Sequence, residues 1–297
     1  MDTPPIKGYL FASLVVAIWS GFIVVSRAGG RSPLTAWDVV AIRYAAAVVF
    51  LLPVWVRRGA ARRFDARMTV LALVGGLGYS LLVFAGFKRA PAADAALLLP
   101  GLLPFTIALA ARWLLDETPG RGRRVGLGFI AAAAACLAVD ARHSGRHLLD
   151  GDLLLVGASI AWAVYSVLLR RWRVSPWDAT IGVAVLTLGA YAPVYLLFLP
   201  KAIVSAPWSD ILLQAVYQGL IATVVQMLLY VRTLALIGPT RLGLLMALVP
   251  GIAAVAAVPL LGESLTAGQV AGLLLAGIGA WIGIRHSQPV ARRPCPT

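Results

Sequence analysis

Charged residues are scarce in this sequence, and its longest apolar stretches contain none. They make up 13% of the 297 residues, while hydrophobic residues make up 60%; soluble domains average roughly 25% and 45–50%. A helix of about 20 apolar residues crosses the ~30 Å hydrocarbon core of a bilayer. The stretch between Arg241 and Glu263 has that length and contains no charge. The scarcity of charge therefore excludes a protein built mainly of soluble domains.

Several kinds of chemical motif are also missing. The two cysteines, Cys136 in an apolar run and Cys295 in the C-terminal tail, give no sign of a disulfide framework. The chain has no glycine-rich phosphate loop, no metal-spaced cluster of His, Cys, Asp or Glu, and no Gly-x-Ser-x-Gly elbow. We therefore predict no metal, no cofactor and no enzymatic activity.

Acidic residues number only twelve, and all fall in predicted loops or at predicted helix ends. A proton-coupled transporter usually needs a carboxylate deep in the membrane. The sequence thus argues against tight proton coupling, with Asp94, Glu117 and Glu263 as the alternatives left open.

Ten apolar segments fill the chain, which predicts an all-α integral membrane protein with ten transmembrane helices. The fifth segment is the shortest, because Arg124 and Asp140 limit its charge-free part. Its end charges must therefore snorkel to the interface. The predicted spans are 8–28, 36–56, 68–87, 93–115, 122–140, 151–171, 177–199, 210–233, 239–261 and 266–285.

The net charge of +14 is explained better by membrane topology than by nucleic-acid binding. A nucleic-acid binder needs a basic face on a folded soluble module, and no segment could form one. With a cytoplasmic N-terminus, the inner segments hold 17 Lys and Arg residues and the outer segments hold 7. Basic residues are enriched in cytoplasmic loops. We therefore expect a multi-pass protein of the bacterial inner membrane, embedded in lipid, with both termini cytoplasmic and no nucleic-acid partner.

Two passages of the sequence align with each other without a gap, Leu102–Glu117 with Leu248–Glu263. A second similarity, around Trp19 and Trp162, has a slightly smaller offset. We therefore divide the chain into a repeat at 1–145 and a repeat at 146–297. Each repeat holds five helices, an odd number, so the second must cross the membrane in the opposite direction. Inverted repeats are common in transporters, with the substrate site near mid-membrane between the repeats. The alternative is chance similarity between helices rich in Leu and Ala.

These features resemble the drug/metabolite transporter superfamily, EamA type. The marks are Leu-Leu-Gly-Glu at 260–263 with Pro250 preceding it, Leu-Leu-Asp-Glu at 114–117, and the Arg-containing stretch at 41–47. Asp116 stands where the family usually has glycine, so the sequence does not decide whether the local turn is kept. The resemblance implies ten helices in two five-helix repeats and export of small metabolites. Members of this length include exporters of aromatic and other amino acids.

Polar and aromatic side chains in the middle of the spans are the candidates for a substrate cavity. Glutamine amides are costly in hydrocarbon unless bonded, so they should face the bundle interior. The alternative for each is an ordinary bond between helices, and Trp208 and Tyr217 are expected at the membrane interface. The candidates are Trp19, Ser20, Tyr79, Ser80, Phe84, Trp162, Tyr165, Ser166, Gln218, Gln226 and Tyr230.

A second group of residues is expected to shape or gate the bundle. Arg43 lies well inside the second span; it could snorkel toward Asp38, hold carbonyls between helices, or meet a carboxylate substrate. Prolines inside spans can kink a helix, and the paired prolines make the fourth and ninth spans candidates for gating. The structural or gating candidates are Arg43, Pro100, Pro104, Glu117, Pro250 and Glu263.

The sequence favours an inner-membrane exporter of small metabolites, most of all amino acids with aromatic ones slightly ahead, which works by alternating access as a monomer or weak dimer. Efflux of organic cations is a second hypothesis, against which the missing central carboxylate counts. A third is an intramembrane lipid-modifying enzyme. Its site would need the cluster between the fifth and sixth spans, which is more simply a solvated loop: Asp140, His143, His147, Asp150 and Asp152.

Overall fold

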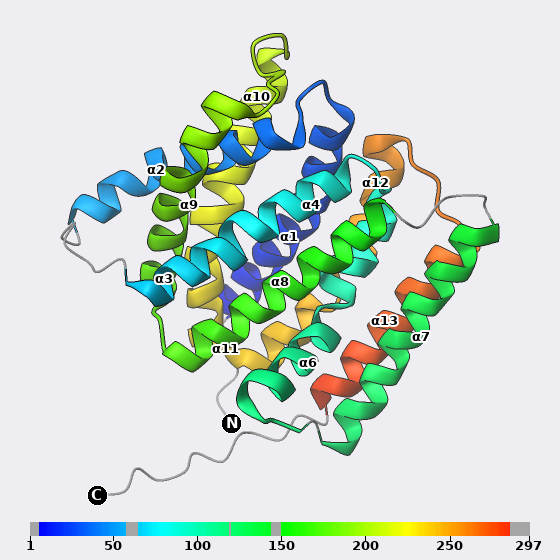
Figure 1. The fold of residues 1–297 in the computed structure, drawn as a ribbon. Helices are drawn as coiled ribbons and strands as arrows, with labels where there is room; N and C mark the ends of the chain where they lie inside the picture. Colours follow the sequence, from blue (N-terminus) through cyan, green and yellow to red (C-terminus); the bar gives the residue numbers. More distant parts are fainter. Residues whose placement is uncertain (1–5, 58–64, 119, 144–149, 286–297) are drawn as a thin grey trace, which may run out of the picture.

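The computed structural model describes residues 6–57, 65–118, 120–143 and 150–285, and within these ranges every regular element is a helix (Figure 1). Elements labelled η are π-helical. In chain order they are α1 (Ile6–Arg31), α2 (Ala36–Arg57), α3 (Ala66–Leu71), η1 (Ala72–Gly78), α4 (Tyr79–Phe87), α5 (Ala92–Ala96), η2 (Leu97–Gly101), α6 (Leu103–Leu115), α7 (Arg121–His143), α8 (Gly151–Trp172), α9 (Pro176–Phe198), α10 (Trp208–Gln214), η3 (Ala215–Val225), α11 (Gln226–Met246), α12 (Val249–Leu261) and α13 (Ala267–Arg285).

Eight helical stretches in the described residues are long and apolar enough to cross a membrane. With α7 and α13 they make up the ten helices expected from the sequence. The largest boundary difference is at the end of the eighth span, predicted at residue 233. The helix runs past Arg232, whose side chain is exposed, and breaks at Gly238, where φ is 78°. An exposed charge near the membrane surface therefore did not mark the helix end.

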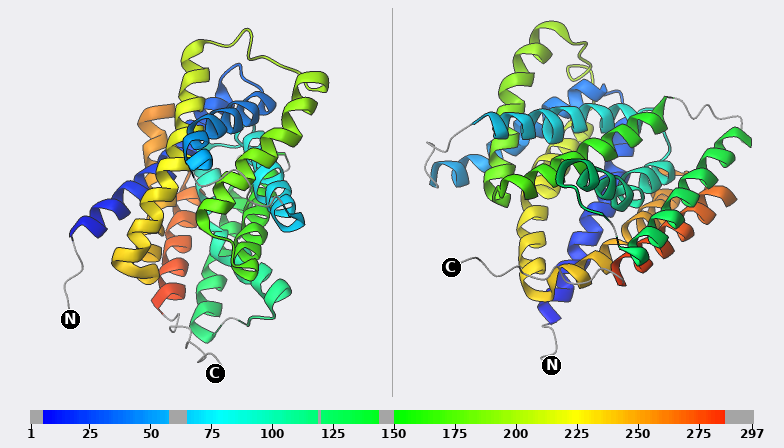
Figure 2. Two further views of the ribbon diagram at one scale, coloured as in Figure 1. Left: turned by 90° about the vertical axis from the view of Figure 1, so that its left-hand side faces the viewer. Right: turned by 60° about the horizontal axis from the view of Figure 1, so that its bottom comes forward.

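The α7 and α13 helices pack along each other at one side of the bundle, as Figures 1 and 2 show. They are antiparallel, since Gly126 faces Gly279 while Asp140 faces Gly268. A Cβ on Gly126 would lie 2.4 Å from the Gly279 carbonyl oxygen. Small residues are therefore required for this close approach, as in other membrane helix pairs. The small-residue stripes on both helices are used within one chain.

The fourth and ninth spans are interrupted at equivalent places in the two repeats. Leu102 and Leu248 have nearly identical backbone angles, φ −80° and ψ −16° against φ −79° and ψ −19°. Each precedes a 13-residue helix, α6 or α12, with Pro104 or Pro250 in its first turn. The two prolines therefore begin helices, where no backbone donor is needed, instead of kinking a helix interior.

The helices that follow these interruptions also end alike. Asp116 and Gly262, which are paired by the same alignment of the repeats, both adopt the left-handed conformation, with φ 54° and 65° and ψ 27° in each. Asp tolerates this region better than most residues with a Cβ. The substitution of Asp for the expected glycine therefore leaves the turn intact, and the question left open by the sequence is answered.

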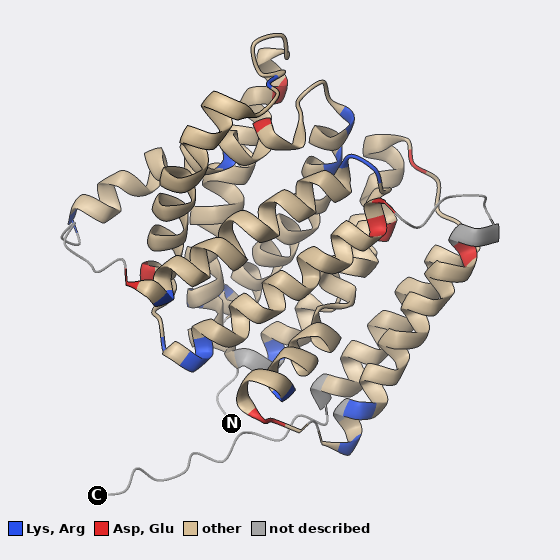
Figure 3. Cartoon of the chain, viewed as in Figure 1, with Lys and Arg blue, Asp and Glu red and all other residues tan. Residues whose placement is uncertain are grey.

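Most charged residues in the described part of the chain lie toward the two ends of the bundle, and few lie in its middle (Figure 3). One end contains Glu263 and the starts of α2, α5 and α8; we call it the Glu263 end. The other contains Glu117 and the starts of α3, α7 and α9; we call it the Glu117 end. Large apolar side chains such as Leu197, Phe198 and Leu274 are exposed between or beside them. This distribution suits a protein whose outer surface meets lipid.

Candidate functional site

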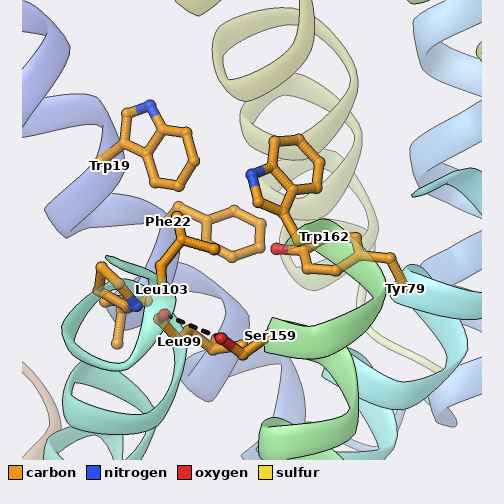
Figure 4. Close-up of a pocket in the computed structure, with 9 residues that line it drawn as sticks. Trp19, Phe22, Tyr79, Leu99, Leu103, Ser159 and Trp162 are labelled. Carbon is orange, nitrogen blue, oxygen red and sulfur yellow. Dashed lines mark hydrogen bonds between the residues drawn. The ribbon is translucent and has the colours of Figure 1, made fainter. Parts of the chain in front are cut away.

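A small pocket lies inside the bundle, next to the interruption of the fourth span. Its walls come from α1, α4, η2, α6 and α8 (Figure 4). Pro100 lies in η2, and Leu103 is the first residue of α6. The residues that line it are Trp19, Phe22, Ile23, Tyr79, Leu99, Pro100, Leu103, Ser159 and Trp162. The break in the fourth span thus forms part of the pocket wall, and discontinuous helices form substrate sites in many transporters.

Aromatic rings dominate the pocket. The Trp19 and Trp162 rings meet edge to face, with centroids 6.1 Å apart and planes at 77°. Trp162 also contacts Tyr79, with centroids 4.9 Å apart, and Tyr165, at 5.2 Å. Figure 4 shows Phe22 between the two indoles and the Tyr79 hydroxyl pointing into the pocket. These spacings are the preferred range for aromatic pairs, so the rings form one connected cluster.

The pocket offers few polar groups. The Ser159 hydroxyl lies 3.2 Å from the Thr106 hydroxyl and 3.5 Å from the Leu99 carbonyl oxygen, at its base. The Trp19 indole nitrogen is buried and has no hydrogen-bond partner among the described residues. A buried donor without a partner is costly. Trp19 is therefore an available donor for a polar group inside the bundle.

The pocket volume is about 20 Å³. This is close to the minimum that holds a single water molecule. A metabolite of even ten heavy atoms does not fit, so this conformation is closed around the pocket. Entry of a larger molecule requires the helices around it to separate.

The structure brings three of the predicted cavity residues, Trp19, Tyr79 and Trp162, together at the pocket, along with the predicted gating residue Pro100. The fourth cavity candidate in contact with them is Tyr165, which packs on Trp162. These residues come from both repeats, since Trp162 and Tyr165 belong to α8. The pocket is thus shared between the halves of the chain.

Four other candidates serve contacts between or within helices. Ser20 is 3.4 Å from the Val249 carbonyl oxygen and Ser166 donates to the Trp162 carbonyl oxygen. Ser80 bonds the hydroxyl of Tyr44 at 2.9 Å. Phe84 is buried and lies beside Arg43.

The amide and tyrosine candidates on the eighth span divide into three environments. Gln218 is fully buried and bonds Ser26, Gln214 and Arg43. Gln226 is also buried, yet neither amide atom has a hydrogen-bond partner among the described residues. The Tyr230 side chain is 40% exposed. The eighth span therefore contributes interhelical bonds, one unsatisfied amide and one surface ring.

Tyr217 does not lie at the membrane interface. Its hydroxyl donates to the Ile18 carbonyl oxygen at 3.0 Å and packs against Gly21 of α1. The expectation of an interfacial ring is therefore wrong, because a tyrosine hydroxyl in the interior can be satisfied by a neighbouring backbone carbonyl. Trp208 is 76% exposed at the start of α10.

Arg43 does not reach toward Asp38. It donates to the Gln218 side-chain oxygen at 3.2 Å. Asp38 is fully buried and accepts hydrogen bonds from Thr35, from the Tyr195 hydroxyl at 2.5 Å and from the Ala202 amide. The carboxylate in the first turn of α2 is therefore satisfied without Arg43.

Sequence reasoning missed Phe22, Ile23, Leu99, Leu103 and Ser159. The first four are apolar residues in apolar spans, so nothing in their identity separates pocket from lipid or core. Ser159 precedes Trp162 by three positions and so shares its helix face. That spacing is a signal that could have identified it.

Both predicted glutamates form ion pairs, at opposite ends of the bundle. Glu263 accepts from the Arg27 Nε at 2.7 Å and from the Ala92 amide at 2.7 Å. Arg27 also donates to the Phe87 carbonyl oxygen at 2.8 Å. The Arg27–Glu263 pair therefore joins four elements: α1, the end of α4, the start of α5 and the end of α12. Nearby, Lys88 donates to Ser32, and burial lowers the pKa of the Lys88 ammonium.

At the Glu117 end, Glu117 accepts from the Arg170 Nη2 at 2.8 Å. Arg171 donates to the Leu114 carbonyl oxygen. Arg170 corresponds to Arg27 at the same offset by which Trp162 corresponds to Trp19. The two ion pairs are therefore equivalent in the two repeats, each joining the first helix of one repeat to the fourth helix of the other.

The acidic and histidine cluster proposed for a lipid-modifying enzyme is only partly described. His147 lies outside the described residues, as does the side chain of His143. Asp140 accepts from the Thr266 hydroxyl at 2.7 Å. Asp152 is buried in the first turn of α8, a favourable place for a carboxylate.

Comparison with known proteins supports this organisation. The model of the EamA-like transporter family matches the chain twice, at residues 6–139 and 149–284. A solved structure with a TM-score of 0.64 and 20% identity covers 93% of this chain and 96% of its own length. That likeness concerns the fold.

Relatives with names include a probable amino-acid metabolite efflux pump of Salmonella typhimurium, 26% identical over 94% of this chain and 95% of its own length. The aromatic amino acid exporter YddG of Ancylobacter novellus is 30% identical over 43% of this chain. The uncharacterized transporter YyaM of Bacillus subtilis is 26% identical over a similar share. The matches cover less than half the length of these last two relatives, 46% and 44%. Because the family description matches both halves, the chain belongs to the EamA-like transporter family.

Proposed function

We propose that this protein exports small metabolites across the bacterial inner membrane, amino acids foremost and aromatic ones slightly preferred. The observation that carries the proposal is the aromatic pocket shared by α1, α4 and α8 beside a broken helix. Stacked and edge-to-face rings hold a flat apolar side chain well. The printed names of the Salmonella and Ancylobacter relatives, an efflux pump for amino-acid metabolites and an aromatic amino acid exporter, agree with this substrate class.

Transport is proposed to occur by alternating access around this pocket. Its volume of about 20 Å³ is too small for an amino acid, so a substrate-bound state must be wider. The interruptions at Leu102 and Leu248 give the fourth and ninth spans equivalent points at which to bend. The ion pairs of Glu263 and Glu117 close the two ends by equivalent contacts. Rocking of the repeats would open one pair while the other stays closed.

The monomer is the proposed working unit. The small-residue faces of α7 and α13, which could in principle bind a second copy, are occupied by each other. Light scattering of the purified protein in detergent checks this, with a monomer mass expected.

Counterflow in proteoliposomes tests the transport proposal. Vesicles loaded with unlabelled phenylalanine should accumulate labelled phenylalanine, with no imposed proton or sodium gradient. Trp19→Ala and Trp162→Ala each remove ring contacts worth about 0.5–1.5 kcal/mol beyond burial, so affinity should fall at least several-fold. Gln226→Leu tests the unsatisfied amide in the same assay.

The matched control is Leu274→Ala, since Leu274 is 63% exposed on α13 and away from the pocket residues. Its transport should stay near that of the unaltered protein. Normal transport by Trp19→Ala, Trp162→Ala and Gln226→Leu, at matched expression, would show that the substrate binds elsewhere. Accumulation of organic cations in preference to amino acids would favour the second hypothesis.

A further inference from the structure

Arg43 is a cation inside the bundle whose partners are all neutral. Its Nη1 donates to the Gln218 side-chain oxygen at 3.2 Å. Gln218 in turn donates to the Ser26 hydroxyl at 3.0 Å and to Gln214 at 3.4 Å, and Gln214 donates to the Val25 carbonyl oxygen. This chain of amides and hydroxyls ends on α1 without a negative charge.

The carboxylate closest to Arg43 along α2 is engaged elsewhere, because Asp38 is held by Thr35, Tyr195 and Ala202. Arg43 pairs with no carboxylate among the residues that the structure describes. A charged side chain in the hydrocarbon region is costly, and such residues usually mark a functional path. The positive charge of Arg43 is thus uncompensated by the protein around it.

The guanidinium of Arg43 lies next to Phe22, one of the residues that line the aromatic pocket. Its Cζ is 5.7 Å from the ring centroid of Phe22, a pocket residue, and 5.9 Å from those of Phe84 and Tyr44. These distances permit cation–π attraction, and all three aromatic side chains are neutral. The Arg43 Nε is buried and has no partner among the described residues. One N–H of the guanidinium is therefore available to a ligand.

We propose that Arg43 binds the carboxylate of the transported substrate. Arg presents parallel N–H groups that match the two oxygens of a carboxylate, and the free Nε is one member of such a pair. Phe22 lies beside the guanidinium and also lines the pocket, so rotation of its side chain would give a substrate in the pocket access to Arg43. The substrate would then place its apolar side chain among Trp19, Tyr79 and Trp162 and its carboxylate on Arg43.

This inference rests on the proposed function and narrows it. It requires a carboxylate on the substrate and predicts that amines and amides of the same shape are poor substrates. A second cation beside Arg43 would increase the uncompensated charge, whereas a carboxylate cancels it. Recognition of the carboxylate is thereby separated from recognition of the side chain, and each can be tested alone.

The test compares phenylalanine with phenylalanine amide, which has the same ring but no carboxylate. Binding is measured by thermal stabilisation of the purified protein, and transport by counterflow. The unaltered protein should bind phenylalanine at least tenfold more tightly than the amide. Arg43→Gln should weaken phenylalanine binding by about 10- to 100-fold, the loss expected for hydrogen bonds to a charged group, and leave amide binding within about twofold.

Arg43→Lys keeps the charge but loses the paired donors, so it should retain an intermediate preference for phenylalanine. The control is Arg112→Gln, which removes an exposed charge from the last turn of α6 and should leave the preference unchanged. If Arg43→Gln cannot be purified in folded form, the preference for phenylalanine over its amide, measured in the unaltered protein and in Arg43→Lys, still tests the proposal.

An unchanged preference for phenylalanine over its amide in Arg43→Gln would overturn the assignment of Arg43 while leaving amino-acid export intact. Equal binding of phenylalanine and the amide by the unaltered protein would overturn it too. Binding of neither compound would overturn both this inference and the proposed function.

Discussion

The Glu263 end and the Glu117 end contain equivalent ion pairs in different surroundings. The side chains of Arg27 and Glu263 are 16% and 14% exposed, whereas those of Arg170 and Glu117 are 54% and 48% exposed. At the Glu263 end the same carboxylate also accepts from the start of α5, and Arg27 reaches the end of α4. Three further carboxylates, those of Asp38, Asp94 and Asp152, are buried at the starts of helices there. The charged groups of the Glu263 end are therefore more buried than those of the Glu117 end.

This difference shows how an inverted repeat can be symmetric in sequence and asymmetric in conformation. An exposed ion pair is weakened by water and salt, and breaking it costs little. A pair removed from water resists separation, because each charge would be left poorly solvated. In the proposed alternating-access mechanism, opening the Glu117 end would therefore require less free energy. Exchange of these two environments would accompany the proposed alternation of access.

The largest expected effect concerns which end faces the outside. In a background with Cys136→Ser and Cys295→Ser, a cysteine at Ser205 of the Glu263 end should react with an impermeant thiol reagent in intact cells. A cysteine at Thr118 of the Glu117 end should react only after permeabilisation, since basic residues favour the cytoplasmic side. Both positions are exposed. The opposite labelling pattern would reverse the proposed orientation and direction of export.

The next largest difference between the two ends is expected when each glutamate is replaced by glutamine. Glu263→Gln leaves Arg27 poorly solvated and should lower the free energy of unfolding by about 3 kcal/mol. Glu117→Gln should lower it by less than about 1 kcal/mol, since its pair is exposed. Chemical unfolding in detergent micelles measures both. Similar losses in the two variants would mean that the difference in exposure has no energetic consequence.

Double-mutant cycles should give a smaller but more specific difference. The coupling free energy between Arg27 and Glu263, measured with Arg27→Gln and Glu263→Gln, should be about 2 kcal/mol. That between Arg170 and Glu117 should be about 0.5 kcal/mol and should decline as salt is added. A salt-sensitive coupling at Arg27 and Glu263 would show that this pair is as hydrated as the other.

The smallest expected effects are at the two left-handed turns. Asp116→Gly places glycine at φ 54° and should stabilise the protein by up to about 1 kcal/mol, while Gly262→Ala at φ 65° should destabilise it by about 1 kcal/mol. Apart from its chain neighbours and its own helix, no atom of the described residues lies within 4 Å of a Cβ added at Gly262, so the effect is that of the backbone alone. Thermal unfolding of the two variants checks the sign of each change.

The positions of the spans could be predicted from the sequence because the bilayer sets a minimum apolar length and charges stay near its surfaces. The repeat could be found because Pro104, Glu117 and their counterparts keep the same spacing. The π-helical segments η1, η2 and η3 and the interruptions at Leu102 and Leu248 were not predicted. They depend on how a span packs against its neighbours, and an apolar sequence carries no record of that packing.

For the candidate site, residue type identified the aromatic members and missed the aliphatic ones. Trp19, Tyr79 and Trp162 stand out in any apolar span, whereas Leu99 and Leu103 do not. Residues that look alike in the sequence also differ in their contacts. The Gln218 amide forms hydrogen bonds, whereas the Gln226 amide has no partner among the described residues. Whether a glutamine in a helix finds a hydrogen-bond partner depends on how the neighbouring helices pack against it.

The sequence by itself determined that this is a membrane protein of ten helices in two opposed repeats, because hydrophobic length, charge distribution and internal spacing are properties of the chain alone. Only the tertiary structure decided that Arg43 meets Gln218 instead of Asp38, that the aromatic residues of both repeats share one closed pocket, and that one of two equivalent ion pairs is buried. Each of these depends on the distance between helices far apart in the chain, and that distance is fixed by packing between side chains that the local sequence pattern does not relate.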